Sequence, residues 1–197
     1  MKGFTMFTSL VLIVCVLCSF MPLSDESEIY DNTVRLHVLA NSDSEYDQNI
    51  KLCVRDAVLS YITEVTEEAQ NAEEASALIS EEIHAICCVA KDALSSLGED
   101  KEVSVTLSSE YYPTREYEEV RLPAGNYTSL RIMIGEAQGQ NWWCVLYPEL
   151  CTGAAKAGET LVKTGFSKDQ IDILTGGEEP KYRLKFKILE IFEKSFG

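Results

Sequence analysis

The chain has 197 residues and a formal net charge of −15, and this length is enough for one domain with a hydrophobic core. Its 46% hydrophobic and 25% charged residues are typical of a globular protein. A surface this acidic repels phosphate backbones and anionic lipid headgroups, so we expect no nucleic-acid partner.

The N-terminal segment predicts export. Lys2 precedes a run without charge from Met6 to Leu23. A basic start followed by an apolar run is typical of a secretory signal, although about 18 such residues could also span a bilayer as an uncleaved anchor. No clear cleavage site distinguishes the two alternatives. We therefore interpret residues 1–24 as a signal peptide or a membrane anchor.

A strand is expected next, at residues 33–40. Val34, Leu36 and Val38 alternate there, which predicts that all three lie on one face of the strand. The same alternation places Arg35 and His37 together on the opposite face.

Two amphipathic helices follow this strand. Ser42 and Glu45 fit a capping box, and the apolar positions behind them repeat at i, i+3 and i+4 up to Val65. Asn71 begins a second capping motif, and the helix that follows is expected to end at Gly98. Because the joint between them is short, we predict a long antiparallel helical hairpin.

The second half of the chain changes to the period of a β-strand. Apolar residues alternate at 103–107, 120–122 and 130–134, a further strand is expected at 141–147, and Pro or Gly residues separate these runs. We therefore predict an α+β fold in which the long antiparallel helical hairpin packs on a mostly antiparallel β-sheet. Residues 30–152 are expected to form this domain, and residues 153–197 a partly helical C-terminal extension.

The segment at residues 141–151 is the most unusual in the sequence. Alternation places Trp142 and Trp143 on opposite faces, so that either one of them is an exposed interface anchor or each fills a separate core. Cys144 and Cys151 flank a short turn. A disulfide between them would close a loop of about eight residues and contribute about 2–3 kcal/mol.

A cysteine hydrolase is the alternative that we weigh against a binding protein. Cys144 would be its nucleophile and His37 its base, with Asn41 or Asp43 orienting the histidine. No recognised local motif joins these residues. A disulfide at Cys144 would exclude this chemistry.

The other cysteines of the domain lie on predicted helices. Cys53 and Cys87 are expected on apolar faces at the same level of the hairpin, as buried thiols or, alternatively, as a bridge. His84 and Cys88 are spaced i, i+4, but zinc needs three or four ligands and His37 is the other histidine of the chain. We expect neither a metal site nor a cofactor.

Five segments of the chain resemble the stage II sporulation protein R family of endospore-forming bacteria. They are Val34–Asp43, Lys51–Ala57, Leu122–Tyr127, Leu130–Gly135 and Asn141–Cys151. The resemblance covers residues 30–152, and the tryptophan–cysteine block is its most specific part. The sequence after Gly153 departs from it.

The resemblance implies a signalling domain without enzymatic activity. Proteins of this family are made in the forespore and exported into the space between the forespore and mother-cell membranes, where they are secreted or anchored. There they activate a membrane-embedded aspartic protease of the mother cell, which processes the sigma factor E precursor. We hypothesise that the matching polar and aromatic residues contact the protease: Arg35, His37, Asn41, Ser42, Asp43, Asn141, Trp142 and Trp143.

Overall fold

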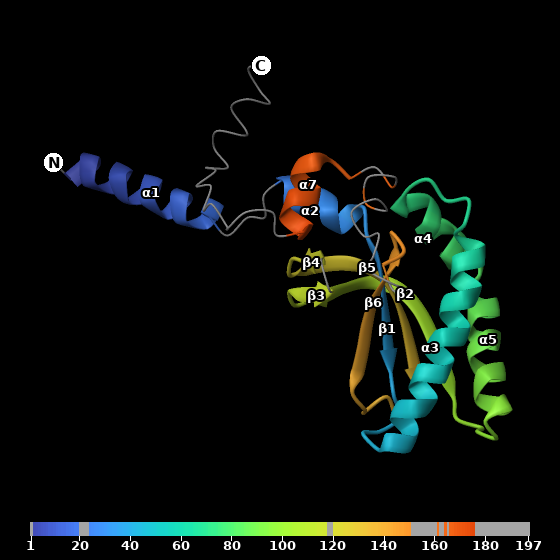
Figure 1. The fold of residues 1–197 in the computed structure, drawn as a ribbon. Helices are drawn as coiled ribbons and strands as arrows, with labels where there is room; N and C mark the ends of the chain where they lie inside the picture. Colours follow the sequence, from blue (N-terminus) through green and yellow to red (C-terminus); the bar gives the residue numbers. More distant parts are fainter. Residues whose placement is uncertain are drawn as a thin grey trace.

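The computed structural model describes residues 2–19, 24–117, 120–150, 161, 164 and 166–175 (Figure 1). Its helices are α1 (Lys2–Ser19), α2 (Ser24–Asp31), α3 (Glu45–Val65), α4 (Ala72–Glu81), α5 (Ile83–Ser96) and α7 (Lys168–Thr175). Its strands are β1 (Val34–Leu39), β2 (Val103–Tyr112), β3 (Arg115–Tyr117), β4 (Val120–Leu122), β5 (Gly125–Ile134) and β6 (Asn141–Tyr147).

The uncharged N-terminal run forms most of α1. Phe7, Leu10 and Leu12 of this helix are exposed. Within the described part of the chain, no helix combines the length and the apolar character needed to cross a membrane. The interpretation of residues 1–24 as a signal peptide or an anchor stays a prediction.

The main sheet has four strands in the order β2-β5-β1-β6. β2 pairs antiparallel with β5, and β6 pairs antiparallel with β1, whereas the central strands β1 and β5 are parallel. A parallel pair needs a long crossover connection, and α3, α4, α5, β2 and the β3–β4 hairpin supply it between β1 and β5. The sheet is therefore mixed, and the short strands β3 and β4 form a separate hairpin.

The predicted long antiparallel helical hairpin is wrong. The helix predicted between Asn71 and Gly98 is in fact two short helices, α4 and α5. They are separated at Glu82, where the chain turns with φ −96° and ψ 9°. The N–H of Glu82 donates to the carbonyl oxygen of Leu78 at 3.2 Å and closes the last turn of α4. No glycine or proline marks this break, so the apolar period runs through it unchanged.

The ends of the helices depend on local polar contacts. The predicted capping box is displaced, because Ser44 and not Ser42 is the N-cap of α3, and its Oγ accepts a hydrogen bond from the N–H of Asp47 at 3.1 Å. Asn71 caps α4 as predicted. Gly98 follows α5 with φ 76°, the left-handed conformation that favours glycine at this position.

Each face of the sheet has its own hydrophobic core. The larger core lies between the sheet and the helices α3, α4 and α5, and includes Leu36, Val54 and Leu130. The smaller core lies on the opposite face, where α2, α7 and the β3–β4 hairpin meet (Figure 1). Its members are Ile29, Val120, Leu122, Val145, Leu161, Phe166 and Leu174. All six residues of β1 are buried, because this strand lies inside the sheet and is covered on both faces.

Candidate functional site

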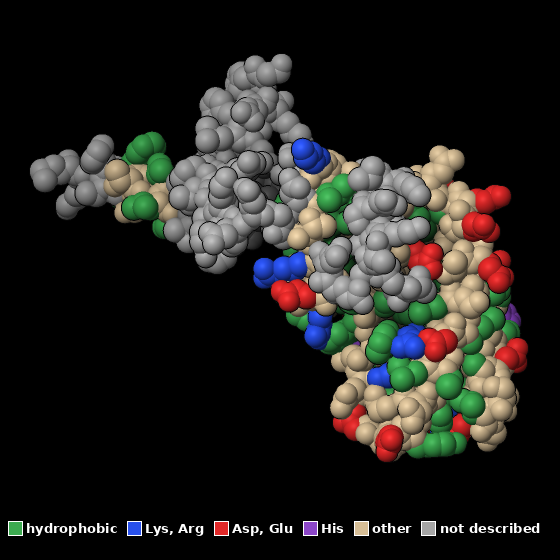
Figure 2. Space-filling model, in the orientation of Figure 1, with side chains coloured by type: hydrophobic (Ala, Val, Ile, Leu, Met, Phe, Trp, Pro, Cys, Tyr) green, Lys and Arg blue, Asp and Glu red, His purple; other side chains and the backbone are tan. Residues whose placement is uncertain are grey.

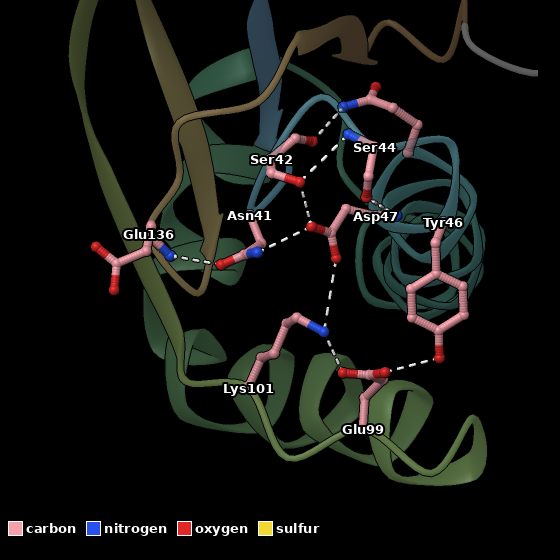
Figure 3. Close-up of polar contacts among 9 residues, drawn as sticks. Asn41, Ser42, Ser44, Tyr46, Asp47, Glu99, Lys101 and Glu136 are labelled. Carbon is pink, nitrogen blue, oxygen red and sulfur yellow. Dashed lines mark hydrogen bonds and ion pairs between the residues drawn. The ribbon is translucent and has the colours of Figure 1, made fainter.

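The predicted partner-binding residues after β1 form a polar cluster at one end of the sheet (Figure 3). Asn41 Nδ2 and Ser42 Oγ both donate to Oδ2 of Asp47, at 2.8 and 2.5 Å. Asn41 Oδ1 accepts from the N–H of Glu136 at 3.0 Å, and Lys101 Nζ lies 3.5 Å from Asp47 Oδ1. The hydrogen bonds to the buried Asp47 lower the pKa of its carboxyl group, and the bond from Asn41 makes the largest contribution.

Asp43 joins the same cluster to the turn before β6. Its Oδ1 accepts from the N–H of Gln140 at 2.7 Å, and the N–H of Gly139 donates to the carbonyl oxygen of Ala40 at 2.9 Å. A Cβ at Gly139 would lie 2.3 Å from the carbonyl oxygen of Ser42, so the close approach requires glycine. Since the side chains of Asn41, Ser42 and Asp43 have partners inside the protein, their geometry favours a structural role.

Arg35 lies on the face of the sheet opposite α3 and α5 and is fully buried. Its Nη2 donates to Tyr117 Oη at 2.6 Å, and its Nε donates to the carbonyl oxygen of Cys144 at 3.1 Å. Its Cζ lies 4.2 Å from the ring centre of Tyr112 and 5.0 Å from that of Tyr127. Three phenol rings therefore enclose one guanidinium group, an arrangement that cation–π attraction stabilises.

His37 lies beside Arg35 on this face, as alternation predicted, and is 5% exposed. Its Nδ1 lies 2.8 Å from Glu110 Oε1, and its Nε2 lies 3.0 Å from Asn141 Oδ1. The Glu110 carboxylate also accepts from Ser129 Oγ at 2.9 Å. The structure thus brings Arg35, His37 and Asn141 together on one face, and Glu110 of the edge strand β2 reaches His37 across β5.

The two tryptophans lie on opposite faces, which confirms the prediction from alternation. The ring of Trp143 lies 5.6 Å from that of His37, and the guanidinium carbon of Arg115 lies 3.9 Å from its centre. Trp142 is on the helical side, is 36% exposed, and has the guanidinium carbon of Arg55 at 4.3 Å from its ring centre. Trp142 is therefore the more exposed of the two.

The pairing required for a cysteine hydrolase does not form. Leu36 lies opposite Cys144 in the β1–β6 ladder, and His37 lies opposite Trp143. Because cross-strand partners share a face and neighbours alternate, Cys144 and His37 are on opposite faces of the sheet. Cys151 lies outside the described residues, so its disulfide with Cys144 stays a prediction.

Cys53, Cys87 and Cys88 are free thiols. The expected burial of Cys53 is wrong: its side chain is exposed, because it lies one position before Val54 and outside the buried stripe of α3. Cys88 Sγ lies 3.4 Å from His84 Nδ1 on α5. Among the residues that the structure describes, no three metal-ligating side chains come together.

Several residues that contribute to the face of the sheet opposite α3 and α5 were not predicted from the sequence. They are Glu110, Tyr112, Arg115, Tyr117 and Arg131. The period of β2 carried a partial signal, since Glu110 and Tyr112 alternate with the apolar residues that face the helices. The sequence of the β3–β4 hairpin, which contributes Arg115 and Tyr117, gave no such signal, because a strand at β3 was not expected.

Comparison with known proteins identifies the family. Residues 30–157 match the family model described as "Stage II sporulation protein R". The chain belongs to this family. It is 39% identical over 123 residues to the stage II sporulation protein R of Bacillus subtilis (strain 168), an alignment that covers 62% of this chain and 55% of that relative. The chain thus spans about half the length of the curated relative that it matches. No solved structure matches it.

Proposed function

We propose that this member of the stage II sporulation protein R family is an exported signal and not an enzyme. It activates a membrane-embedded aspartic protease of the mother cell, and the protease then processes the sigma factor E precursor. One observation carries the proposal: the family match at residues 30–157 includes the complete four-stranded sheet and the helices α3, α4 and α5. The separation of Cys144 from His37 on opposite faces of the sheet argues against a hydrolase built on this pair.

The proposed place of action is the space between the forespore and mother-cell membranes. Lys2 and the uncharged run to Leu23 support export through a secretory signal. In that oxidising compartment a Cys144–Cys151 disulfide is expected to form. Mass spectrometry without reduction of cytoplasmic and extracytoplasmic fractions tests both points. A chain found only in the cytoplasm would contradict export, and free thiols at Cys144 and Cys151 in the exported protein would contradict the disulfide.

The proposed activation depends on how tightly the signal protein binds the two states of the protease. A ligand activates a protease only if it binds the active state more tightly than the inactive one. An exposed tryptophan next to an arginine is typical of an interface centre, because its ring buries much area at little cost in conformational entropy. Trp142 with Arg55 is such a pair on the helical side of β6. We assign it to the protease interface.

The direct test is reconstitution of processing in a host that does not sporulate. Full-length protein, protease and sigma factor E precursor are co-expressed, and the processed sigma factor is followed by immunoblotting. We expect processing to require all three proteins and to fall at least tenfold with Trp142→Ala. Tyr111→Ala is the matched control, because Tyr111 is 66% exposed on the other edge strand. Equal processing with both variants would exclude Trp142 from the interface.

A further inference from the structure

Among the residues that the structure describes, three arginines on the face of the sheet opposite α3 and α5 lack the ion pairs expected in an acidic protein. Arg35 Nη1, Arg115 Nε and Arg131 Nε are buried, and none has a hydrogen-bond partner in the described part of the chain. The ion pairs of that part involve other cations, among them Arg55 and Arg121. This absence is notable because the chain has 32 acidic and 17 basic side chains.

The strand register brings these arginines into one patch. Arg131 lies beside His37 in the β5–β1 ladder, and His37 lies beside Trp143 in the β1–β6 ladder. Since neighbouring strands are about 4.8 Å apart, Arg131 and Trp143 are separated by about 10 Å along the backbone row. Arg115 covers the Trp143 ring at 3.9 Å. We call Arg35, Arg115, Arg131 and Trp143 the arginine face.

The positive charge of the arginine face is not balanced from within the described structure. Glu110 is an acid on this face, and its carboxylate contacts His37 Nδ1 at 2.8 Å and Ser129 Oγ at 2.9 Å. Burial raises the pKa of Tyr112 and of Tyr117, so these phenols stay neutral and provide no negative charge. Aromatic rings hold the guanidinium groups of Arg35 and Arg115 in place but leave their charge available to a ligand.

Part of this face is open to solvent. Ser104, Thr106 and Ser108 of β2 are exposed and alternate with the residues that face the helices. Thr106 lies beside Arg131, which is only partly buried, as are Arg115 and Trp143. Figure 2 shows most acidic side chains of its view along the helical side, and basic side chains toward the β3–β4 hairpin and the sheet. A ligand can therefore reach Arg115 and Arg131, and Arg35 acts from beneath.

We propose that the arginine face binds a carboxylate-bearing, extended peptide segment of a partner protein. Guanidinium groups pair with carboxylates through two parallel hydrogen bonds. A short acidic segment can bind the positively charged arginines without being repelled by the acidic helices, because salt screening limits that repulsion to about 8–10 Å at physiological salt. A membrane surface or a nucleic acid extends beyond that distance and meets the acidic parts of the protein. The site does not depend on which protein supplies the segment.

The test uses a defined probe and a matched charge control. The full chain with Trp142→Phe retains Trp143 as its single tryptophan, and is titrated with acetylated tetraglutamate amide by calorimetry and by tryptophan emission. We expect saturable binding with a change in emission, binding at least tenfold weaker with tetraglutamine, and weakening as salt rises from about 50 to 500 mM. Arg131→Gln should weaken tetraglutamate binding at least tenfold.

Arg121→Gln is the control, because Arg121 is 63% exposed on β4, is paired with Glu116, and carries the same charge. Equal loss in both variants, equal binding of the two peptides, or no saturable binding would overturn the proposal. Binding to phosphatidylglycerol vesicles through Arg131 without peptide binding would overturn it in favour of lipid. If Arg131→Gln does not fold, Arg131→Lys replaces it. Lysine keeps the positive charge but cannot form two parallel hydrogen bonds to a carboxylate, so tetraglutamate binding must still weaken. The assay contains no protease, so its failure leaves the proposed activation of the protease untouched.

Discussion

The two faces of the four-stranded sheet consist of the same strands but are stabilised differently. On the helical face, Leu36, Leu130 and Ile132 pack against α3 and α5 as an apolar layer. On the other face, Arg35 and His37 lie among aromatic rings and make directed hydrogen bonds. An apolar layer tolerates many sequences of similar volume, whereas a buried polar network requires particular partners. The helical face therefore supplies most of the apolar burial that stabilises the fold, whereas the second face carries buried polar groups beside its smaller core.

The largest effect should come from breaking the helical face. Leu36→Ala removes a side chain that is fully buried in the centre of the larger core, and lost burial together with a residual cavity costs about 2–5 kcal/mol. Urea denaturation followed by circular dichroism measures the free energy of unfolding. Leu97→Ala is the control, because Leu97 is 42% exposed and should change stability by less than about 0.5 kcal/mol. Comparable losses in the two variants would mean that Leu36 does not stabilise the core as described.

The second prediction concerns the end of the sheet, where polar groups and not apolar area hold the chain. The pKa of Asp47 is lowered, chiefly by the hydrogen bond from Asn41. Because the folded state holds the carboxylate ionised, its contribution to stability is present above the usual aspartate pKa of about 4. As pH falls below that value the contribution is lost.

Asp47→Asn should therefore lower stability at pH 7 by about 1–3 kcal/mol, the cost of unsatisfied buried donors. It should also flatten the fall in unfolding free energy between about pH 5 and pH 2. Asp56→Asn is the control, because Asp56 is 64% exposed in a surface pair with Arg55 that contributes little. An unchanged pH profile in Asp47→Asn would show that the polar cluster does not stabilise the fold.

Features with a local signal could be predicted from the sequence. The alternation in β1, the cap at Asn71 and the glycine at residue 98 each depend on residues next to them, and the structure has them in place. The break at Glu82 and the parallel pairing of β1 with β5 have no such signal. They result from how the helices cover the sheet, which is a tertiary effect.

The candidate site divides in the same way. Alternation placed Arg35 with His37 and separated Trp142 from Trp143, because side-chain direction in a strand follows from position alone. The partners of Arg35 are Tyr117 at 82 residues and Cys144 at 109 residues along the chain. No local sequence pattern predicts contacts between residues so far apart in the chain. The partners of Arg35 could therefore be identified only in the structure.

The smallest effect should come from Arg35→Met, which compares the two faces within one strand. Arg35 and Leu36 are adjacent and both fully buried, yet they face opposite sides of the sheet. Methionine keeps much of the apolar volume and removes a guanidinium group that has no acidic partner in the described structure. The variant loses the hydrogen bonds to Tyr117 and to the carbonyl oxygen of Cys144, at about 1 kcal/mol each. Removal of the buried charge offsets much of this loss, because replacing such a charge by an apolar side chain is often close to neutral or stabilising. We therefore expect an unfolding free energy within about 1 kcal/mol of the unsubstituted protein by urea denaturation. A loss as large as that of Leu36→Ala would show that Arg35 chiefly stabilises the fold, and the two faces would then contribute to stability to a similar extent.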